Sequence, residues 1–383
     1  MEYQNWWLLV LPVFFLLGWL AARIDVKQLI SETKQVPSNY IDGLNFLLNE
    51  EKDKAIEVLA ELARVDPDSV ELQFAIAGLF LQNGEIQRAL TVHQALLDRH
   101  DLTLSQRNRA ILAVGRDYYK SGMYDRAEQY LNRVGGKEYE AKALDILRHL
   151  FVSQDDWQSA IDVTIKYQTI TGDTKTNEIG HFMVEICLNE LKQGKRDSAS
   201  QWIQKALRED PKLPRPYIVL GDIYKSVGDH EGALNEWAKL EDCAPTHLAL
   251  VIESIVNCYE ELERPEDCLK YLKSLVDVVS CEALFENLFN LTLELEGSDS
   301  AAKLSRKLLL ETSDVLWSIR ILDHMRQNIS YEASENMKLI SSVLNKTRPT
   351  PEYTCKNCGY HARAHYWHCP ACQAWDTYSP IKQ

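Results

Sequence analysis

Small residues recur in pairs, twelve positions apart, along much of this chain of 383 residues. Two of the pairs begin 34 residues apart, at Gly43 and Ala77, and two more have the same separation, at Cys187 and Gly221. A small residue on one helix that faces an alanine on the next lets the two backbones pack closely, so the pattern predicts a series of helical hairpins. The pairs are Gly43 and Ala55, Ala77 and Ala89, Gly115 and Ala127, and Gly221 and Ala233, with weaker copies at Arg148 and Ala160 and at Cys187 and Ala199.

The spacing resembles that of the tetratricopeptide repeat. We predict such repeats over residues 36–246 and divergent helical repeats over residues 247–345. A left-handed residue is useful at the turn between the two helices of each hairpin, and glycine adopts that conformation without strain. Glycines stand at this point in four hairpins, as Gly84, Gly122, Gly194 and Gly228.

Stacked hairpins of this kind form an α-solenoid with an extended concave face, and such faces bind peptides or other proteins. The residues on the first helix of each hairpin that do not pack against the second helix point into this face. Arg116, Tyr119 and His181 are therefore candidate protein-binding residues. A spacer without a binding role is the alternative for the array, and an ordinary surface or groove position is the alternative for each residue.

The N-terminal region has the features of a membrane anchor. The segment from Trp6 to Ala22 contains 17 residues without a charge, at the short end of what spans a bilayer as a helix. Arg23, Lys27 and Lys34 follow it, so the positive-inside rule predicts a periplasmic N-terminus and a cytoplasmic remainder. A cleaved signal peptide would need a basic segment before the apolar run, and none is present. We predict an anchor over residues 1–23, with its helix at about 6–22, and a juxtamembrane segment over 24–35.

Four of the nine cysteines stand in two Cys-x-x-Cys pairs near the C-terminus. Two such pairs can surround one tetrahedral cation, because a two-residue spacer lets both sulfurs of a pair reach it. Residues 346–352 contain two prolines and read as a linker, and residues 353–383 as the metal-binding module. The nearby histidines His361, His365 and His368 are not predicted ligands; they are predicted to lie at the surface or to contact the ligands rather than the metal. The predicted ligands are Cys355, Cys358, Cys369 and Cys372.

Tetrahedral sulfur sites suit iron or zinc, and the residues leave this choice open. YTCKNCGY and CPAC resemble the two knuckles of rubredoxin, but the segment between them is shorter, and Gln373 stands where a second glycine is expected. A closed four-sulfur site has no open position for a substrate, so its predicted role is structural.

The remaining composition narrows the class of protein. The net charge of −14 argues against non-specific nucleic-acid binding, which needs an excess of Lys and Arg. The sequence contains no HExxH, GxSxG or phosphate-binding loop, so no catalytic residues are assigned. The other five cysteines lack the spacing of a disulfide framework and indicate a reducing compartment. They are Cys187, Cys243, Cys258, Cys268 and Cys281.

The fold predicted for the whole chain is mainly α, with a transmembrane helix, a tetratricopeptide-repeat α-solenoid and a small rubredoxin-like module of the zinc-ribbon type. This combination resembles the lipopolysaccharide assembly protein B family of Gram-negative bacteria. The resemblance is most specific in NYIDGLNFLL, in GRDYYKSGMYDRAE and in YWHCPACQAW.

The resemblance implies a non-enzymatic adaptor of the inner membrane. Its implied partners are the deacetylase of the lipid A pathway, the membrane-anchored ATP-dependent metalloprotease that degrades this deacetylase, and an inner-membrane protein that monitors lipopolysaccharide. It also places the metal ligands at the four cysteines of the C-terminal pairs. Two other classes remain open: a general scaffold for envelope assembly without a proteolytic role, and a redox or electron-transfer protein.

Overall fold

The structure is a computed structural model that describes residues 69–173, 176–279, 281–311 and 353–379, together with Lys54, Glu57 and Val58. The predicted anchor at 1–23, the juxtamembrane segment, the pair Gly43 and Ala55, and the linker at 346–352 lie outside the described residues. Within the described ranges, no helix is both long and apolar enough to cross a bilayer.

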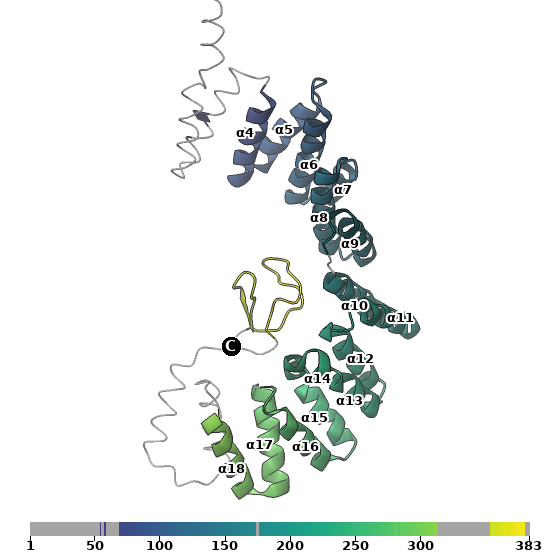
Figure 1. Cartoon of the computed structure of the whole chain (residues 1–383), viewed down its shortest axis with the longest axis vertical. Coiled ribbons are helices and arrows are strands. Elements are labelled where there is room, and N and C mark those ends of the chain that lie inside the picture. The colour runs from purple at the N-terminus through teal and green to yellow at the C-terminus, as the bar shows by residue number, and fades with distance from the viewer. Residues whose placement is uncertain are drawn as a thin grey trace, which may run out of the picture. The chain divides into compact units, whose positions relative to one another are not determined.

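The described chain divides into two compact units, the first ending at Gln154 and the second starting at Asp155, with the short segment 169–171 grouped with the first. Both units consist of consecutive helices (Figure 1). The first unit contains α4 (Val70–Gln82), α5 (Ile86–Leu97), α6 (Leu104–Lys120), α7 (Tyr124–Leu131) and α8 (Lys137–Ser153).

The second unit continues the helical pattern and ends in the small C-terminal module. Its helices are α9 (Trp157–Thr171), α10 (Thr176–Lys192), α11 (Arg196–Glu209), α12 (Pro214–Ser226), α13 (His230–Ala238), α14 (Leu240–Cys243), the 3₁₀ helix η2 (Pro245–Leu250), α15 (Ile252–Glu261), α16 (Pro265–Leu275), α17 (Glu282–Glu296) and α18 (Ser298–Glu311). The module contains the strands β1 (Tyr353–Thr354) and β2 (His361–Ala362).

The predicted close packing within the hairpins is confirmed. Ala77 on α4 and Ala89 on α5 are fully buried, as are Cys187 on α10 and Ala199 on α11. Gly115 and Gly221, the two glycines of the series that the structure describes, are packed more tightly still. A Cβ atom added at Gly115 would lie 2.8 Å from the Leu131 side chain on the partner helix. A glycine is therefore a steric requirement at Gly115 and Gly221, whereas Arg148 occupies the corresponding position in the hairpin of α8 and α9.

The left-handed conformation predicted for the four glycine turns is confirmed, and two further hairpins turn without a glycine. Gly84 and Gly228 have φ values of 78° and 81°, in the left-handed region. In the turn after α8 and in the turn after α15, no glycine is present. Asp155 and Glu263 take the left-handed conformation there, with φ values of 55° and 54°. A side chain is strained at such a position, so these two turns are held by the packing of their helices.

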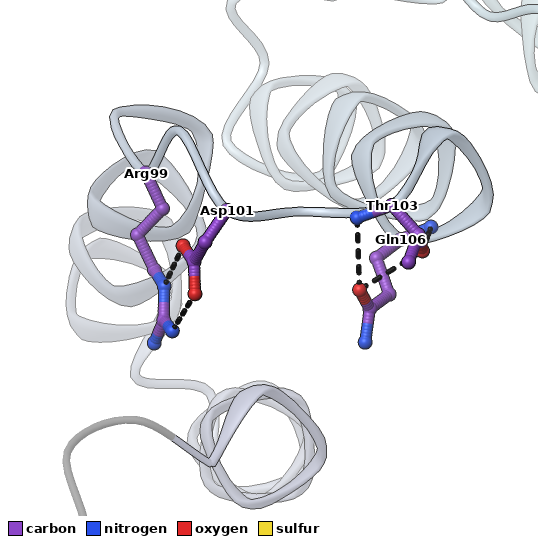
Figure 2. A network of polar contacts seen from close by, with 4 residues as sticks. All are labelled: Arg99, Asp101, Thr103 and Gln106. Atoms are coloured by element: carbon purple, nitrogen blue, oxygen red, sulfur yellow. Dashed lines mark hydrogen bonds and ion pairs between the residues drawn. The ribbon is translucent and has the colours of Figure 1, made fainter.

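The turn between α5 and α6 is fixed by two polar contacts (Figure 2). The Arg99 guanidinium donates two hydrogen bonds to the Asp101 carboxylate, at 2.9 and 2.6 Å, and this contact lowers the pKa of Asp101 to about 2. Thr103 then caps α6: its hydroxyl accepts from the backbone N–H of Gln106, and the Gln106 side chain accepts from the backbone N–H of Thr103. This capping box sets where α6 begins, and hence which side chains share each face of that helix.

Replacing Gly221 with alanine should destabilise the second unit. The added Cβ would lie 2.2 Å from Nε1 of Trp237, which is fully buried and donates a hydrogen bond to the Ile218 carbonyl oxygen at 3.2 Å. We expect a loss of about 1–3 kcal/mol of unfolding free energy, measured by urea denaturation followed by circular dichroism.

The matched control is Gly78→Ala on α4, where an added Cβ would meet nothing within 4 Å. This substitution should be neutral or stabilising by up to about 1 kcal/mol, because alanine is the better helix former. Equal effects of the two substitutions would contradict the packing argument.

Candidate functional site

The C-terminal module is built from two knuckles with the same backbone hydrogen bonds. In each, the N–H of the first cysteine donates to the carbonyl five residues later, from Cys355 to Tyr360 and from Cys369 to Ala374, both at 2.9 Å. The residue four positions after that cysteine donates back to its carbonyl, also at 2.9 Å. Strands β1 and β2 pair antiparallel beside the first knuckle, with Tyr353 opposite Ala362. The matching turns direct both pairs of sulfurs toward one point.

Gln373 occupies the position in the second knuckle where a glycine was expected, and the backbone there is left-handed as it is at Gly359. Gly359 and Gln373 are the residues that donate back to their cysteines, and their φ values are 75° and 58°. Both knuckles therefore need the left-handed conformation at this position. In the second knuckle a glutamine adopts it, at some cost in backbone strain.

The geometry of the four sulfurs fits a tetrahedral cation. The Sγ atoms of Cys355 and Cys372 are 3.8 Å apart, those of Cys358 and Cys369 are 3.7 Å apart, and all four lie within 4.8 Å of one another. A tetrahedron with metal–sulfur bonds of about 2.3 Å has edges of roughly 3.8 Å. Zinc and iron both bind cysteine sulfur in this geometry.

The surroundings of the sulfurs favour thiolates that are neutralised by a cation. Burial alone would raise the pKa of Cys355, but the Thr377 hydroxyl, 3.2 Å away, and nearby backbone N–H groups lower it to about 6. The Asn357 side-chain amide donates to Sγ of Cys372 at 3.3 Å. Four adjacent thiols cannot all ionise without a cation, and the pKa of Cys358 is raised to about 12 despite a backbone hydrogen bond from Tyr360. A divalent metal would remove this conflict.

The module packs against the helices of the second unit through two tryptophans. The first of these, Trp375, is 7% exposed. Its ring stacks on His181 with the centroids 4.9 Å apart, and it meets the edges of Phe182 at 5.6 Å and Trp157 at 6.2 Å. These three partners come from α9 and α10, so the second knuckle is held against the first two helices of this unit.

The second tryptophan, Trp367, lies among three imidazoles. His247, on η2, stacks on it with the centroids 5.6 Å apart and the planes at 10°. His365 of the module meets it edge-on at 4.8 Å, and His181 lies 5.8 Å away. The Arg215 guanidinium is 5.7 Å from the same ring. Trp367 is thus the point where the module, α10, α12 and η2 come together.

His181 was predicted to bind another protein, and its position in the structure does not agree with that prediction. Its side chain is fully buried, and neither ring nitrogen has a hydrogen-bond partner among the described residues. It contacts the module of its own chain instead. Arg116 is exposed on α6, and Tyr119 is half-buried with its ring 5.8 Å from that of Tyr124. These two remain candidates for contact with a partner.

Of the residues that receive the module, His181 was predicted to bind protein, whereas Arg215, His247 and Trp157 were not predicted. Arg215 and His181 each stand six residues before the small residue of their hairpin, on the first helix. This shared register was a usable signal, because it places both on the face that binds proteins in such arrays. Nothing in the spacing pointed to His247 or Trp157. Arg215 is 6% exposed and donates to the Glu185 carboxylate at 2.6 Å.

Replacing a buried cysteine of the module should release both the metal and the module. We expect Cys369→Ser to remove the bound cation and to move the tryptophan emission to longer wavelength, because Trp367 and Trp375 would reach water. Helicity should remain, since the helices have their own core. The measurements are elemental analysis, fluorescence and far-ultraviolet circular dichroism. Cys243→Ser, at a half-buried cysteine of α14, is the control and should change none of them; a variant at Cys369 that keeps the metal would count against the site.

Acidification should undock the module, because docking holds its histidines neutral. Burial lowers the pKa of His247 and of His365 to about 4, and lowers that of His181 well below its usual value. Undocked, these imidazoles would titrate near pH 6.5, so docking is fully stable above that pH and weakens as the pH falls from about 6.5 toward 4. The charged or titratable groups around them are Arg215 with its partner Glu185, Lys356, His368, and Asp376, whose Oδ1 lies 3.9 Å from Nε2 of His247.

The measurement is the urea concentration at which the module undocks, followed by tryptophan emission between about pH 7 and pH 5.5, with the metal content checked at each pH. His365→Gln should reduce the slope with pH in this window. A slope unchanged in that variant would show that other groups take up the protons.

Comparison with known protein families agrees with both parts of this architecture. A family model described as a rubredoxin metal binding domain matches residues 353–380, and a tetratricopeptide repeat model matches residues 43–101. The four cysteines of the module all lie inside the first match. The chain is therefore a helical tetratricopeptide-repeat array with a C-terminal module of the rubredoxin type.

Relatives match nearly the whole chain. Lipopolysaccharide assembly protein B of Escherichia coli K12 is 28% identical over 98% of this chain and 97% of its own length. The protein of the same name from Haemophilus influenzae is 24% identical, with 97% of each chain covered. A solved tetratricopeptide repeat protein from Parabacteroides merdae is 13% identical, covers 80% of this chain and 97% of its own, and superposes with a TM-score of 0.33. The resemblance stated from the sequence is confirmed by the first two relatives.

Proposed function

Because this chain is similar along nearly its whole length to lipopolysaccharide assembly protein B, we propose that it is a non-enzymatic adaptor in lipopolysaccharide assembly. This similarity is the observation that carries the proposal. An array of helical hairpins supports it, since the extended concave surfaces of such arrays bind other proteins.

The adaptor would act on the first committed step of lipid A synthesis. In this proposal the chain binds the lipid A pathway deacetylase and brings it to a membrane-anchored ATP-dependent metalloprotease, which degrades it. An inner-membrane protein that monitors lipopolysaccharide would oppose this delivery. The apolar segment at 6–22 would hold the chain in the inner membrane with its N-terminus in the periplasm, and sharing one membrane raises the effective concentration of the protease.

The metal would have a structural role. Cys355, Cys358, Cys369 and Cys372 would hold one iron or zinc ion, and four sulfurs leave no position for a substrate. When bound, the cation neutralises the thiolates and replaces the core that so short a module lacks. The docked module would then keep α9, α10, α12 and η2 in one arrangement, through Trp367 and Trp375.

The half-life of the deacetylase after protein synthesis is blocked tests this function. Cells with the full chain should degrade the deacetylase, and cells without the chain should accumulate it and overproduce lipopolysaccharide. A form lacking residues 1–23 should still bind the deacetylase but degrade it several-fold more slowly, because the shared membrane no longer concentrates the protease. Equal turnover with and without the whole chain would refute the adaptor role.

The two alternatives give different results in the same cells. A general assembly scaffold would leave deacetylase turnover unchanged while envelope complexes fail to form. A redox protein would hold iron, show a charge-transfer absorption in the visible range, and change its metal site reversibly on reduction. Zinc in the purified protein, together with deacetylase turnover that requires the chain, would favour the adaptor.

A further inference from the structure

The first helix of each hairpin presents a defined face, here called the helix-A face. It consists of the residue six positions before the small packing residue and the residue directly after that packing residue. In the second unit, His181 on α10 and Arg215 on α12 belong to this face, and the module covers both. The helix-A face therefore already binds a protein segment in this molecule, one that belongs to the same chain.

In the first unit, the same register defines the helix-A face of α4, α6 and α8. An ion pair shows that neighbouring helices present it on one side: the Arg109 guanidinium on α6 donates to the Glu71 carboxylate on α4 at 2.6 Å, and it lies over the Phe74 ring at 4.0 Å. The residues of this face are Glu71 and Gly78 on α4, Arg109 and Arg116 on α6, and Lys142 and His149 on α8.

Arg109 has a carboxylate partner on α4, whereas the equivalent position beside Arg116 carries no carboxylate. Its counterpart on α4 is Gly78, where even an added Cβ would meet nothing within 4 Å. Arg116 is exposed and forms no ion pair with the residues that the structure describes. Lys120, one turn further along α6, is also exposed, and Tyr119 lies between them with its ring half-buried. The positive charges of Arg116 and Lys120 are thus close in sequence to the ring of Tyr119, and the equivalent position on α4, Gly78, has no side chain.

The charge of α6 makes this surface unusual in an acidic protein. The whole chain has 42 Lys and Arg against 56 Asp and Glu, whereas residues 69–154 have 11 against 10. The acidic residue of α6 is Asp117, which is fully buried and bonded to His93 at 2.6 Å. It therefore offers no charge to the surface, and the exposed charges of α6 are all positive.

We propose that the helix-A face of α4, α6 and α8, together with Tyr119 and Lys120 beside it on α6, binds an acidic segment of a partner protein, with Arg116 and Lys120 paired to its carboxylates. Tyr119 packs against the apolar part of that segment. Under the proposed function this segment belongs to the deacetylase, so the identity of the partner rests on that function. The preference for carboxylates does not depend on that function, because it follows from the exposed positive charges of α6.

The test uses the full chain in a non-ionic detergent and two labelled peptides, one rich in Glu and its equivalent with Gln. We expect the Glu peptide to bind and the Gln peptide not to bind. Arg116→Glu combined with Lys120→Glu should weaken binding of the Glu peptide by about tenfold or more, because two attractive charges become repulsive. Arg116→Gln combined with Lys120→Gln should weaken it less and serves if charge reversal perturbs folding.

The matched control is Arg107→Glu. Arg107 is an exposed arginine on the same helix, nine residues before Arg116 and hence on the opposite side. It should change peptide binding by less than about twofold. Equal loss in this control, equal binding of the two peptides, or no binding of either would overturn the proposal. Binding of vesicles that contain phosphatidylglycerol, lost with Arg116 while the peptide does not bind, would overturn it in favour of a membrane surface.

The outcome can be separated from that of the proposed function. If charge reversal abolishes peptide binding but leaves deacetylase turnover normal, the face binds acidic segments and the deacetylase is not the partner. If the unaltered chain has no effect on deacetylase turnover, the adaptor function fails, and the peptide measurement still decides the surface.

Discussion

The packing of Trp367 and Trp375 against the helices is the interaction that holds the C-terminal module in the second unit. The two rings join a short module, whose own core consists of little more than Cys355, Ala362, Cys369 and Tyr378, to four separate helical elements. The buried face includes imidazoles and a guanidinium. Metal binding and helix packing are coupled through the backbone of the second knuckle, because Trp367 and Trp375 lie just before Cys369 and just after Cys372 in the sequence.

The repeat architecture was predictable because it depends on a steric rule. Two small residues at a fixed separation in the sequence can be recognised without knowledge of the fold. The burial of Ala77, Ala89 and Cys187 confirms that these positions pack inside the hairpins. The four cysteines were predictable for a similar reason, since the spacing within a knuckle is set by local turns. Asp155, Glu263 and Gln373 show the limit of such rules, because the left-handed conformation persists there without the glycine that would reveal it.

Docking of the module was not predictable, because it depends on contacts between residues far apart in the sequence. His181 had the register of a binding residue, but the sequence does not say whether the segment that it meets belongs to another protein or to the same chain. The two units treat the same helix-A positions differently. Arg215 and His181 are buried under the module, whereas Arg109 is 40% exposed and Arg116 is exposed. The buried pair contacts the tryptophan rings of the module, whereas the side chains of the exposed pair reach water.

The order of these segments along the chain has a consequence for folding during synthesis. Trp157, Phe182 and His181 leave the ribosome long before Trp375, so α9 and α10 must fold with the receiving face open to water. Contacts of such long sequence separation form late, because the intervening chain must first close into a loop. A synthesis that stops before the second knuckle would leave an ordered array with an exposed aromatic surface, which is the kind of species that aggregates or is recognised by chaperones.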